Sequence, residues 1–181
     1  NKRENYRKAY KNFDPKKVKL GYIGHDYIYK GVIEIANSVT LVKKEISQVE
    51  LTGAFSGMGL GKAQKIWKNA GGTVLQEVDR DEFYDSLDIL CYPLYEDYGS
   101  QVYALVILEA MRRGVPMVLS NTAANRELVE PEMIPLIDKV NEKSIAKAVI
   151  SLHKKNAGEV SDYLRERFKK ISRTVVKEKW R

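Results

Sequence analysis

Residues 88–120 read DILCYPLYEDYGSQVYALVILEAMRRGVPMVLS, in which two apolar runs flank a polar loop and a helical pattern. The first run, Asp88–Pro93, is almost wholly apolar, as expected of a strand that is buried on both faces of a parallel sheet. Ser100 is a suitable N-cap for the helix, and Gly114 suits its C-terminal end. The second run, Pro116–Ser120, is the next strand. A strand, a helix and a strand in succession indicate a crossover connection between parallel strands.

The same alternation extends along the rest of the chain. Within Lys30–Lys44, for example, apolar residues recur at helical spacing and form one face. The other predicted strands are Val18–Gly24, Val49–Ala54, Thr73–Val78 and Ile134–Ile137. The other predicted helices are Lys62–Asn69, Asp79–Leu87, a helix from Asn141 that is broken at Gly158, and a last basic helix toward Trp180. This order predicts an α/β fold, a Rossmann-like and mainly parallel sheet of about six strands with helices on both faces.

The candidate binding loops are the segments that follow the predicted strands. In sheets of this kind, ligands bind at the carboxyl ends of the strands, close to the point where the strand order reverses. The segments are residues 24–31, 54–62, 77–81, 94–101 and 120–127.

Composition predicts one cytoplasmic domain. With 181 residues, of which 44% are hydrophobic, the chain has enough apolar surface for a single core. Its one cysteine, Cys91, excludes a disulfide framework and lies within an apolar run, which indicates a buried strand residue. No apolar run approaches the roughly 18–20 residues that are needed to span a bilayer. The N-terminus does not have the pattern of a signal peptide.

The formal charge of +7 is compatible with binding to nucleic acid, anionic lipid or a phosphate-bearing substrate. Much of the excess lies in residues 1–19 and 165–181, which are predicted as basic helices with a solvated or membrane-facing surface. No nucleic-acid-binding motif is present, so nucleic acid is not an expected partner. Because the chain begins with Asn rather than Met, we expect it to be a fragment of a longer protein.

The sequence patterns argue against three other kinds of site: a Walker phosphate loop, a dinucleotide-binding loop and a structural zinc site. The segment Gly57–Lys62 (GMGLGK) looks like a phosphate-binding loop, but the Walker pattern requires glycine in place of Ser56 and a hydroxyl residue in place of Ala63. The segment also follows the second predicted strand, whereas the dinucleotide fingerprint follows the first. Two histidines and one cysteine without clustered spacing argue against a structural zinc site.

Glu109 is the most unusual side chain of the stretch 88–120, because it lies within an otherwise apolar helix and therefore needs a partner. One interpretation is an ion pair with a neighbouring Lys or Arg; the other is an acceptor for a sugar hydroxyl. The N-terminus of the same helix suits a pyrophosphate, because its N–H groups are unpaired and carry partial positive charge. His25 ends the first predicted strand, and both a loop role and a site role are compatible with that position.

The segments Leu105–Met111 (LVILEAM) and Gly114–Val118 (GVPMV) resemble the signature of the group 1, family 4-like retaining glycosyltransferases, which have two Rossmann-like domains in the GT-B architecture. Further similarity lies in Gly24-His25 through Lys30-Gly31, in Ser120–Val129, in Asn141–Leu152 and in Lys177–Trp180. The resemblance covers about Val18 to Trp180. It implies that residues 1–181 are a single C-terminal nucleotide-sugar-binding domain, whose N-terminal acceptor domain is absent from this chain.

The resemblance also implies a diphosphate site. Lys30 would pair with the diphosphate beside Gly24, with His25 assisting where the family has an arginine. The amides of Gln101, Val102 and Tyr103 would cap the phosphates.

The sugar, ribose and base sites follow from the same resemblance. Glu109 would hold the ribose hydroxyls, and the loop that contains Val78 would face the base. The family has two glutamates separated by seven residues. The spacing places the first of them at Gln101, whereas the local motif favours Glu96, and either residue would hold the sugar.

The implied function is retaining transfer of a hexose from a UDP- or GDP-linked sugar to a glycan or lipid-linked acceptor, as in polysaccharide biosynthesis. Neither a metal nor another cofactor is expected. The expected partners are the nucleotide sugar, the missing N-terminal domain and a membrane surface at the inner face. The isolated domain is expected to catalyse little. The alternatives are a non-catalytic nucleotide-sugar-binding domain, favoured by His25 and Gln101, and a sugar-nucleotide epimerase.

Overall fold

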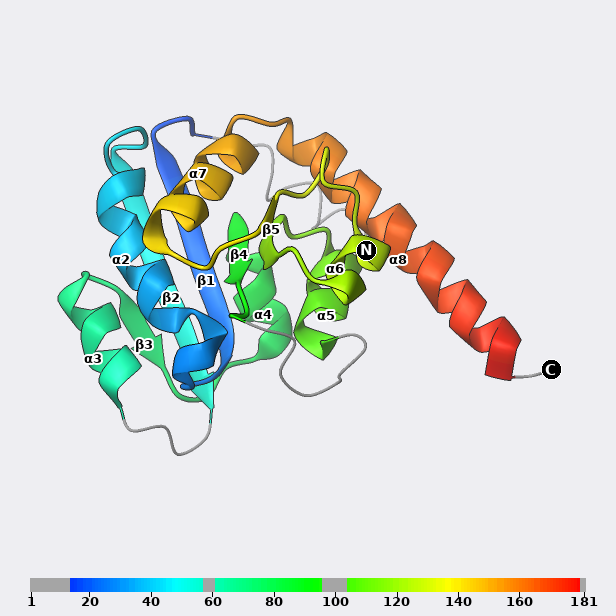
Figure 1. Cartoon of the computed structure of the whole chain (residues 1–181), viewed down its shortest axis with the longest axis horizontal. Coiled ribbons are helices and arrows are strands. Elements are labelled where there is room, and N and C mark those ends of the chain that lie inside the picture. The colour runs from blue at the N-terminus through cyan, green and yellow to red at the C-terminus, as the bar shows by residue number, and fades with distance from the viewer. Residues whose placement is uncertain (1–13, 57–60, 96–103, 180–181) are drawn as a thin grey trace.

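The computed structural model describes residues 14–56, 61–95 and 104–179, and Figure 1 shows a single sheet covered by helices. The strands are β1 (Lys17–His25), β2 (Gln48–Ser56), β3 (Thr73–Leu75), β4 (Ile89–Tyr92), β5 (Met117–Ser120) and β6 (Leu136–Ile137). Their order in the sheet is β3-β2-β1-β4-β5-β6, and every pair of neighbours is parallel. The predicted Rossmann-like sheet is therefore confirmed.

Helices cover both faces of the sheet, as predicted. The helical segments are η1 (Ile28–Lys30), α2 (Val32–Val42), α3 (Lys62–Asn69), α4 (Arg80–Asp85), α5 (Leu105–Arg113), α6 (Ala123–Leu128), α7 (Glu142–His153) and α8 (Ala157–Lys179). Helix α2 packs against α3 and α7, and α5 packs against α4 and α8. In Figure 1, α2 and α7 lie in front of the sheet and α4 lies behind it. Every residue of β4 and β5 is buried between these layers.

Aromatic rings fill the core between β1, β2, β4 and α3. The rings of Tyr22 and Tyr92 are stacked with their centroids 6.1 Å apart, and Phe55 meets Trp67 edge-on at 5.2 Å. The buried indole of Trp67 donates a hydrogen bond to the carbonyl of Val32 at 2.7 Å, so its polar group is satisfied.

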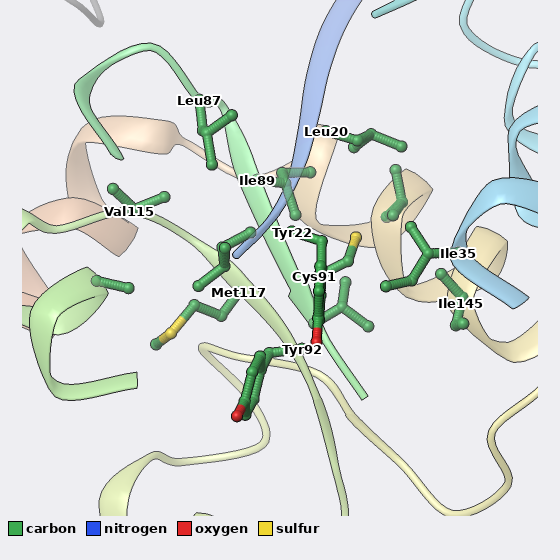
Figure 2. Packing of buried hydrophobic residues seen from close by; sticks show 14 of the residues in the cluster. Leu20, Tyr22, Ile35, Leu87, Ile89, Cys91, Tyr92, Val115, Met117 and Ile145 are labelled. Carbon is green, nitrogen blue, oxygen red and sulfur yellow. The ribbon is translucent and has the colours of Figure 1, made fainter. Parts of the chain in front are cut away.

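Cys91 is fully buried in the same core, among the hydrophobic residues drawn in Figure 2. Burial raises the pKa of its thiol to about 12. A thiol with so high a pKa stays protonated at neutral pH and is a poor nucleophile. The interpretation of Cys91 as a buried strand residue is therefore confirmed.

Helix α5 begins later than the sequence predicts. Ala104 is its N-cap, with an extended backbone (φ −68°, ψ 127°) and without a side-chain cap. The helix therefore begins at Leu105, and Ser100, the predicted cap, lies outside the described residues.

The predicted break at Gly158 is also wrong. Helix α7 ends at His153, and Gly158 lies in the first turn of α8. The side-chain oxygen of Asn156 accepts hydrogen bonds from the N–H groups of Gly158 and Glu159, at 3.0 and 3.3 Å, and so caps α8. An asparagine cap, rather than a glycine, separates the two helices.

Two short segments differ from the expected pattern because periodicity carries little information over so few residues. Strand β3 ends at Leu75, so Val78 lies in the connection to α4. The expected loop 120–127 contains α6, whose N-cap Thr122 accepts from the N–H of Asn125 at 3.2 Å.

The connection between β1 and α2 packs tightly against the end of β4. Gly31, the N-cap of α2, has a left-handed backbone (φ 66°). A Cβ at this position would lie 2.7 Å from the carbonyl oxygen of Pro93 and 2.9 Å from a Val140 methyl group. Glycine is therefore required both for the backbone angle and for the close approach of the two loops.

We predict that Gly31→Ala lowers the free energy of unfolding by about 1–3 kcal/mol more than Gly61→Ala does, because the added methyl group clashes with Pro93. Gly61 is the matched control: it also has φ 66°, but a Cβ there would meet no described heavy atom within 4 Å. Urea unfolding of the two variants measures the difference. Equal losses of unfolding free energy in the two variants would mean that the loop at Gly31 does not pack tightly against Pro93.

Candidate functional site

The strand order reverses between β1 and β4, which are neighbours in the sheet but come from the two halves of the chain. In open parallel sheets, ligands bind at the carboxyl ends of the strands, where the strand order reverses. Gly24 and His25 end β1, and Pro93 follows β4. At Gly24, a Cβ would lie 2.8 Å from the hydroxyl of Tyr22, so this position is closely packed. The candidate site is therefore the carboxyl edge between β1 and β4.

Lys30 brings a positive charge to this edge. It ends the short helix η1, and its N–H donates to the carbonyl of Tyr27 at 3.0 Å. Its Nζ donates to the hydroxyl of Tyr92 at 3.3 Å and lies 5.4 Å from the ring centroids of both Tyr29 and Tyr92. Cation–π and hydrogen-bond contacts thus hold the ammonium group beside the last residue of β4.

The His25 ring is held in one orientation. Its Nδ1 lies 2.9 Å from the carbonyl oxygen of Ser56, at the end of β2. Because a carbonyl oxygen only accepts, Nδ1 carries the proton, and the neutral ring presents the lone pair of Nε2. His25 attracts an anion through Nε2 only when this second nitrogen is also protonated.

Glu109 lies on α5 and is paired with two residues of α4. The hydroxyl of Tyr84 donates to its Oε2 at 2.8 Å, and the guanidinium of Arg80 forms an ion pair with the same oxygen. Burial, and then the bond to Glu109, raise the pKa of Tyr84, so its hydroxyl remains a donor. The ion-pair interpretation of Glu109 is confirmed. Within the described residues both contacts use Oε2, and Oε1 stays able to accept from a ligand.

A buried arginine holds α4 against α5. Arg113 forms an ion pair with Asp81 and another with Asp85 at 2.6 Å. On α4 itself, the hydrogen bond to Glu109 raises the pKa of the Arg80 guanidinium. This packing sets the position of Arg80 and Tyr84 relative to the Glu109 carboxylate.

The end of β5 is tied to the end of β4. The Ser120 hydroxyl accepts from the N–H of Leu94 and donates to the carbonyl of the same residue, both at 2.6 Å. The side-chain amide of Asn125 donates to the carbonyl of Ser120 at 2.9 Å. These bonds set the course of the chain as it leaves β4.

The structure therefore places Gly24, His25, Lys30 and Glu109 on elements that meet at the carboxyl edge, with half-buried Val78 just before α4. The remaining predicted site residues, Glu96, Gln101, Val102 and Tyr103, lie outside the described residues.

Sequence reasoning missed Arg80, Tyr84 and Asp26. Arg80 and Tyr84 belong to a short acidic helix that carries no site pattern, and only its packing against α5 brings them to Glu109. Asp26 follows β1 and is buried. Burial raises the pKa of this carboxyl, although the N–H of Gly61 and the side chain of Gln64 bond to it.

Two cavities, of 350 and 570 Å³, lie at the opposite, amino edge of the sheet. Both are lined by His153, Lys155 and Ala157, at the junction of α7 and α8. Neither cavity lies at the carboxyl edge between β1 and β4.

Over the described ranges, no group of three or more His, Cys, Asp and Glu side chains is placed to bind a metal ion. Among the described helices, none combines the length and the apolar character that a membrane span requires.

Comparison with known proteins gives a family match over most of the chain. The family described as "Glycosyl transferases group 1" matches residues 17–155. No curated protein matches the chain significantly.

Several solved structures share the fold of this chain. TarM from S. aureus, in a complex with fondaparinux, α-GlcNAc-glycerol and UDP, has a TM-score of 0.74 at 19% identity, over 94% of this chain and 36% of TarM. The C-terminal domain of LpcC, a group 1 glycosyl transferase of Francisella tularensis, has a TM-score of 0.70 at 16% identity, over 94% of this chain and 92% of that domain.

A third match is the pneumococcal O-GlcNAc transferase GtfA, in complex with UDP and GlcNAc. Its TM-score is 0.66 at 13% identity, over 90% of this chain and 36% of GtfA. At these identities the likeness shows a common fold. The chain spans about a third of the length of TarM and of GtfA.

Proposed function

The chain belongs to the group 1 family of glycosyltransferases, and from this premise we propose that it is the donor-binding domain of a retaining enzyme of the family 4 type. Its donor is a hexose linked to UDP or GDP, and the N-terminal domain that completes the enzyme binds the acceptor. The observation that carries the proposal is the position of Lys30, an ammonium group held beside β4 at the point where the strand order reverses.

The diphosphate is the part of the donor that Lys30 binds. Cleavage of the bond between the sugar and the diphosphate leaves negative charge on the leaving group, and a fixed cation stabilises that charge. The N-terminus of α5 adds partial positive charge at the same edge. Gln101, Val102 and Tyr103, which precede this terminus in the sequence, contribute their amides to the phosphates, and Gln101 or Glu96 binds the sugar.

Glu109 binds the ribose. Its Oε2 is engaged by Tyr84 and Arg80, which orient the carboxylate, and Oε1 accepts from a ribose hydroxyl. Val78, between β3 and α4, contacts the base. The complexes of TarM and GtfA with UDP support a uridine donor, because those proteins share this fold.

A non-catalytic nucleotide-binding domain is the second candidate. The observation that favours it is the orientation of His25, which in its neutral form presents a lone pair to the site where the family has an arginine. The choice of acceptor, a role in polysaccharide biosynthesis, and a cytoplasmic location with contact to the inner membrane face stay predictions.

We predict that one of UDP, GDP and ADP binds saturably. Lys30→Ala and Glu109→Ala should each weaken its binding by about tenfold or more, because each variant removes a hydrogen bond to a charged group. Isothermal titration calorimetry measures the affinities. Lys44→Ala is the control, because Lys44 is exposed and lies beyond the far end of α2. Binding that is unchanged in both site variants contradicts these roles.

We predict that His25→Arg strengthens binding of the same nucleotide roughly two- to fivefold, as expected of one added and partly solvated ion pair. A permanent cation replaces a ring whose neutral form offers a lone pair to the phosphates. Calorimetry at low and high salt checks the result, since the gain should shrink as salt screens the pair. A loss of affinity would mean that the His25 ring has a specific role in the site.

We predict that the chain alone binds nucleotide sugar but turns it over slowly, because the acceptor site is on the other domain. Release of nucleoside diphosphate from the donor, with and without saccharide, measures this. Rapid turnover by the chain alone would refute the division of labour between the two domains.

A further inference from the structure

A chain of side-chain hydrogen bonds links the end of β1 to the end of β3. Asp26, which follows β1, is only 7% exposed, and its carboxylate accepts from the N–H of Gly61 and from the side-chain amide of Gln64. The Oε1 of Gln64 accepts in turn from the Nε2 of Gln76 at 3.1 Å. Gln76 is exposed and directly follows β3. The side chains of Asp26, Gln64 and Gln76, called here the amide relay, therefore run along the carboxyl edge of the sheet.

The buried carboxylate sets the direction of the amide relay. An ionised carboxylate only accepts hydrogen bonds, so Gln64 presents its Nε2 to Asp26. The Oε1 of Gln64 then faces the other way and can only accept, so Gln76 presents its Nε2 to Gln64. Within the described part of the chain, the Oε1 of Gln76 accepts no hydrogen bond. The relay therefore offers a fixed acceptor at the end of β3.

This acceptor lies close to the proposed ribose site. Gln76 comes four residues before Arg80, the first residue of α4, which forms the ion pair with Glu109. In the sheet, β3 is two strands from β1, about 10 Å away. The ribose and the α-phosphate of a nucleoside diphosphate can bridge that distance, with the diphosphate at Lys30 and the ribose at Glu109. The base, which is bonded to the ribose, is then within reach of Gln76.

Nucleotide bases differ in what they present to such an acceptor. The ring nitrogen of the base-pairing edge carries a hydrogen in uracil (N3–H) and in guanine (N1–H). In cytosine (N3) and adenine (N1) the same ring nitrogen has a lone pair. A fixed amide oxygen accepts from the N–H of the first two bases and is repelled by the lone pair of the other two. A site built to bond an N–H group discriminates strongly against an analogue that lacks it.

We propose that Gln76 binds the base of the donor nucleotide through its Oε1, and that Asp26 and Gln64 fix the direction of this acceptor, so that the site selects uracil or guanine. Gln76 is the specificity-determining contact, and Asp26 and Gln64 are positioning residues. The inference rests on the proposed function, because Lys30 and Glu109 place the diphosphate and the ribose. It adds a reason for base choice to the contact proposed for Val78.

Isothermal titration calorimetry with size-matched nucleotides tests the proposal. UDP should bind about tenfold or more tighter than CDP, or GDP about tenfold or more tighter than ADP. Gln76→Ala should weaken binding of the preferred nucleotide about five- to tenfold. The same variant should leave the affinity for ribose 5-diphosphate, which has no base, unchanged. Gln48→Ala is the matched control, because Gln48 is also exposed and begins β2 at the amino edge.

Gln64→Leu tests the positioning role. The leucine fills much of the same volume, but it leaves the Gln76 amide free to turn its N–H groups toward the base. Binding of the preferred nucleotide should weaken and binding of its size-matched competitor should strengthen, so that the ratio of the two affinities falls about fivefold or more. A purely structural disturbance would weaken both nucleotides by the same factor. Circular dichroism checks that the variants are folded.

The outcomes separate this inference from the proposed function. A preference for CDP or ADP, or a preferred nucleotide whose affinity is unchanged in Gln76→Ala, overturns the base contact and leaves the roles of Lys30 and Glu109 standing. Equal losses of affinity for both nucleotides in Gln64→Leu overturn the positioning role. If the folded chain binds none of the four nucleotides, the proposed function fails, and the inference fails with it.

Discussion

The contact of Gly31 with Pro93 is the constraint on which the functional edge depends. It brings the loop after β1 against the end of β4, the two strands between which the strand order reverses. Because the loops meet at van der Waals distance, Lys30 reaches the hydroxyl of Tyr92, and the N–H of Tyr95 reaches the carbonyl of Tyr29. The Lys30 ammonium group and the pair Tyr29 and Tyr95 therefore lie where the two loops come together.

A second set of contacts positions the carboxylate. Arg113 of α5 is buried and forms ion pairs with Asp81 and Asp85 of α4. These ion pairs hold α4 against α5. Arg80 and Tyr84 then meet Glu109 from the neighbouring helix. Removing the charge of Glu109 would leave Arg80 without its partner, so the ion pair and the proposed ribose contact are energetically coupled.

The candidate site residues and the two cavities lie at opposite edges of the sheet. The carboxyl edge carries one fixed ammonium group, one oriented carboxylate and the exposed tyrosines. The two cavities lie at the amino edge, where α7 gives way to α8. The candidate site residues and these two cavities are thus at opposite edges of the sheet, and the switch point of the strand order is at the edge that carries the site residues.

Local patterns in the sequence were sufficient to predict the sheet and most of the helices. They also placed Gly24, Lys30 and Glu109 on elements that meet at the carboxyl edge of the sheet. Apolar runs, helical periodicity and glycine stops act over a few residues, so they can be recognised without a structure. Short elements such as α6, and the asparagine cap that begins α8, were missed because a few residues carry too little of such a pattern.

The partners of Glu109 follow from tertiary packing alone. Arg80 is 29 residues away from Glu109 in the sequence, and Tyr84 is 25 residues away. The sequence of α4 is that of an ordinary solvated helix with acidic residues in its first turn, and it does not mark these two residues as site residues. Likewise, Tyr29 and Tyr95 become neighbours only when Gly31 packs on Pro93. Spacing along the chain predicts which edge a side chain reaches, whereas the contact that it makes there depends on how closely two separate elements approach.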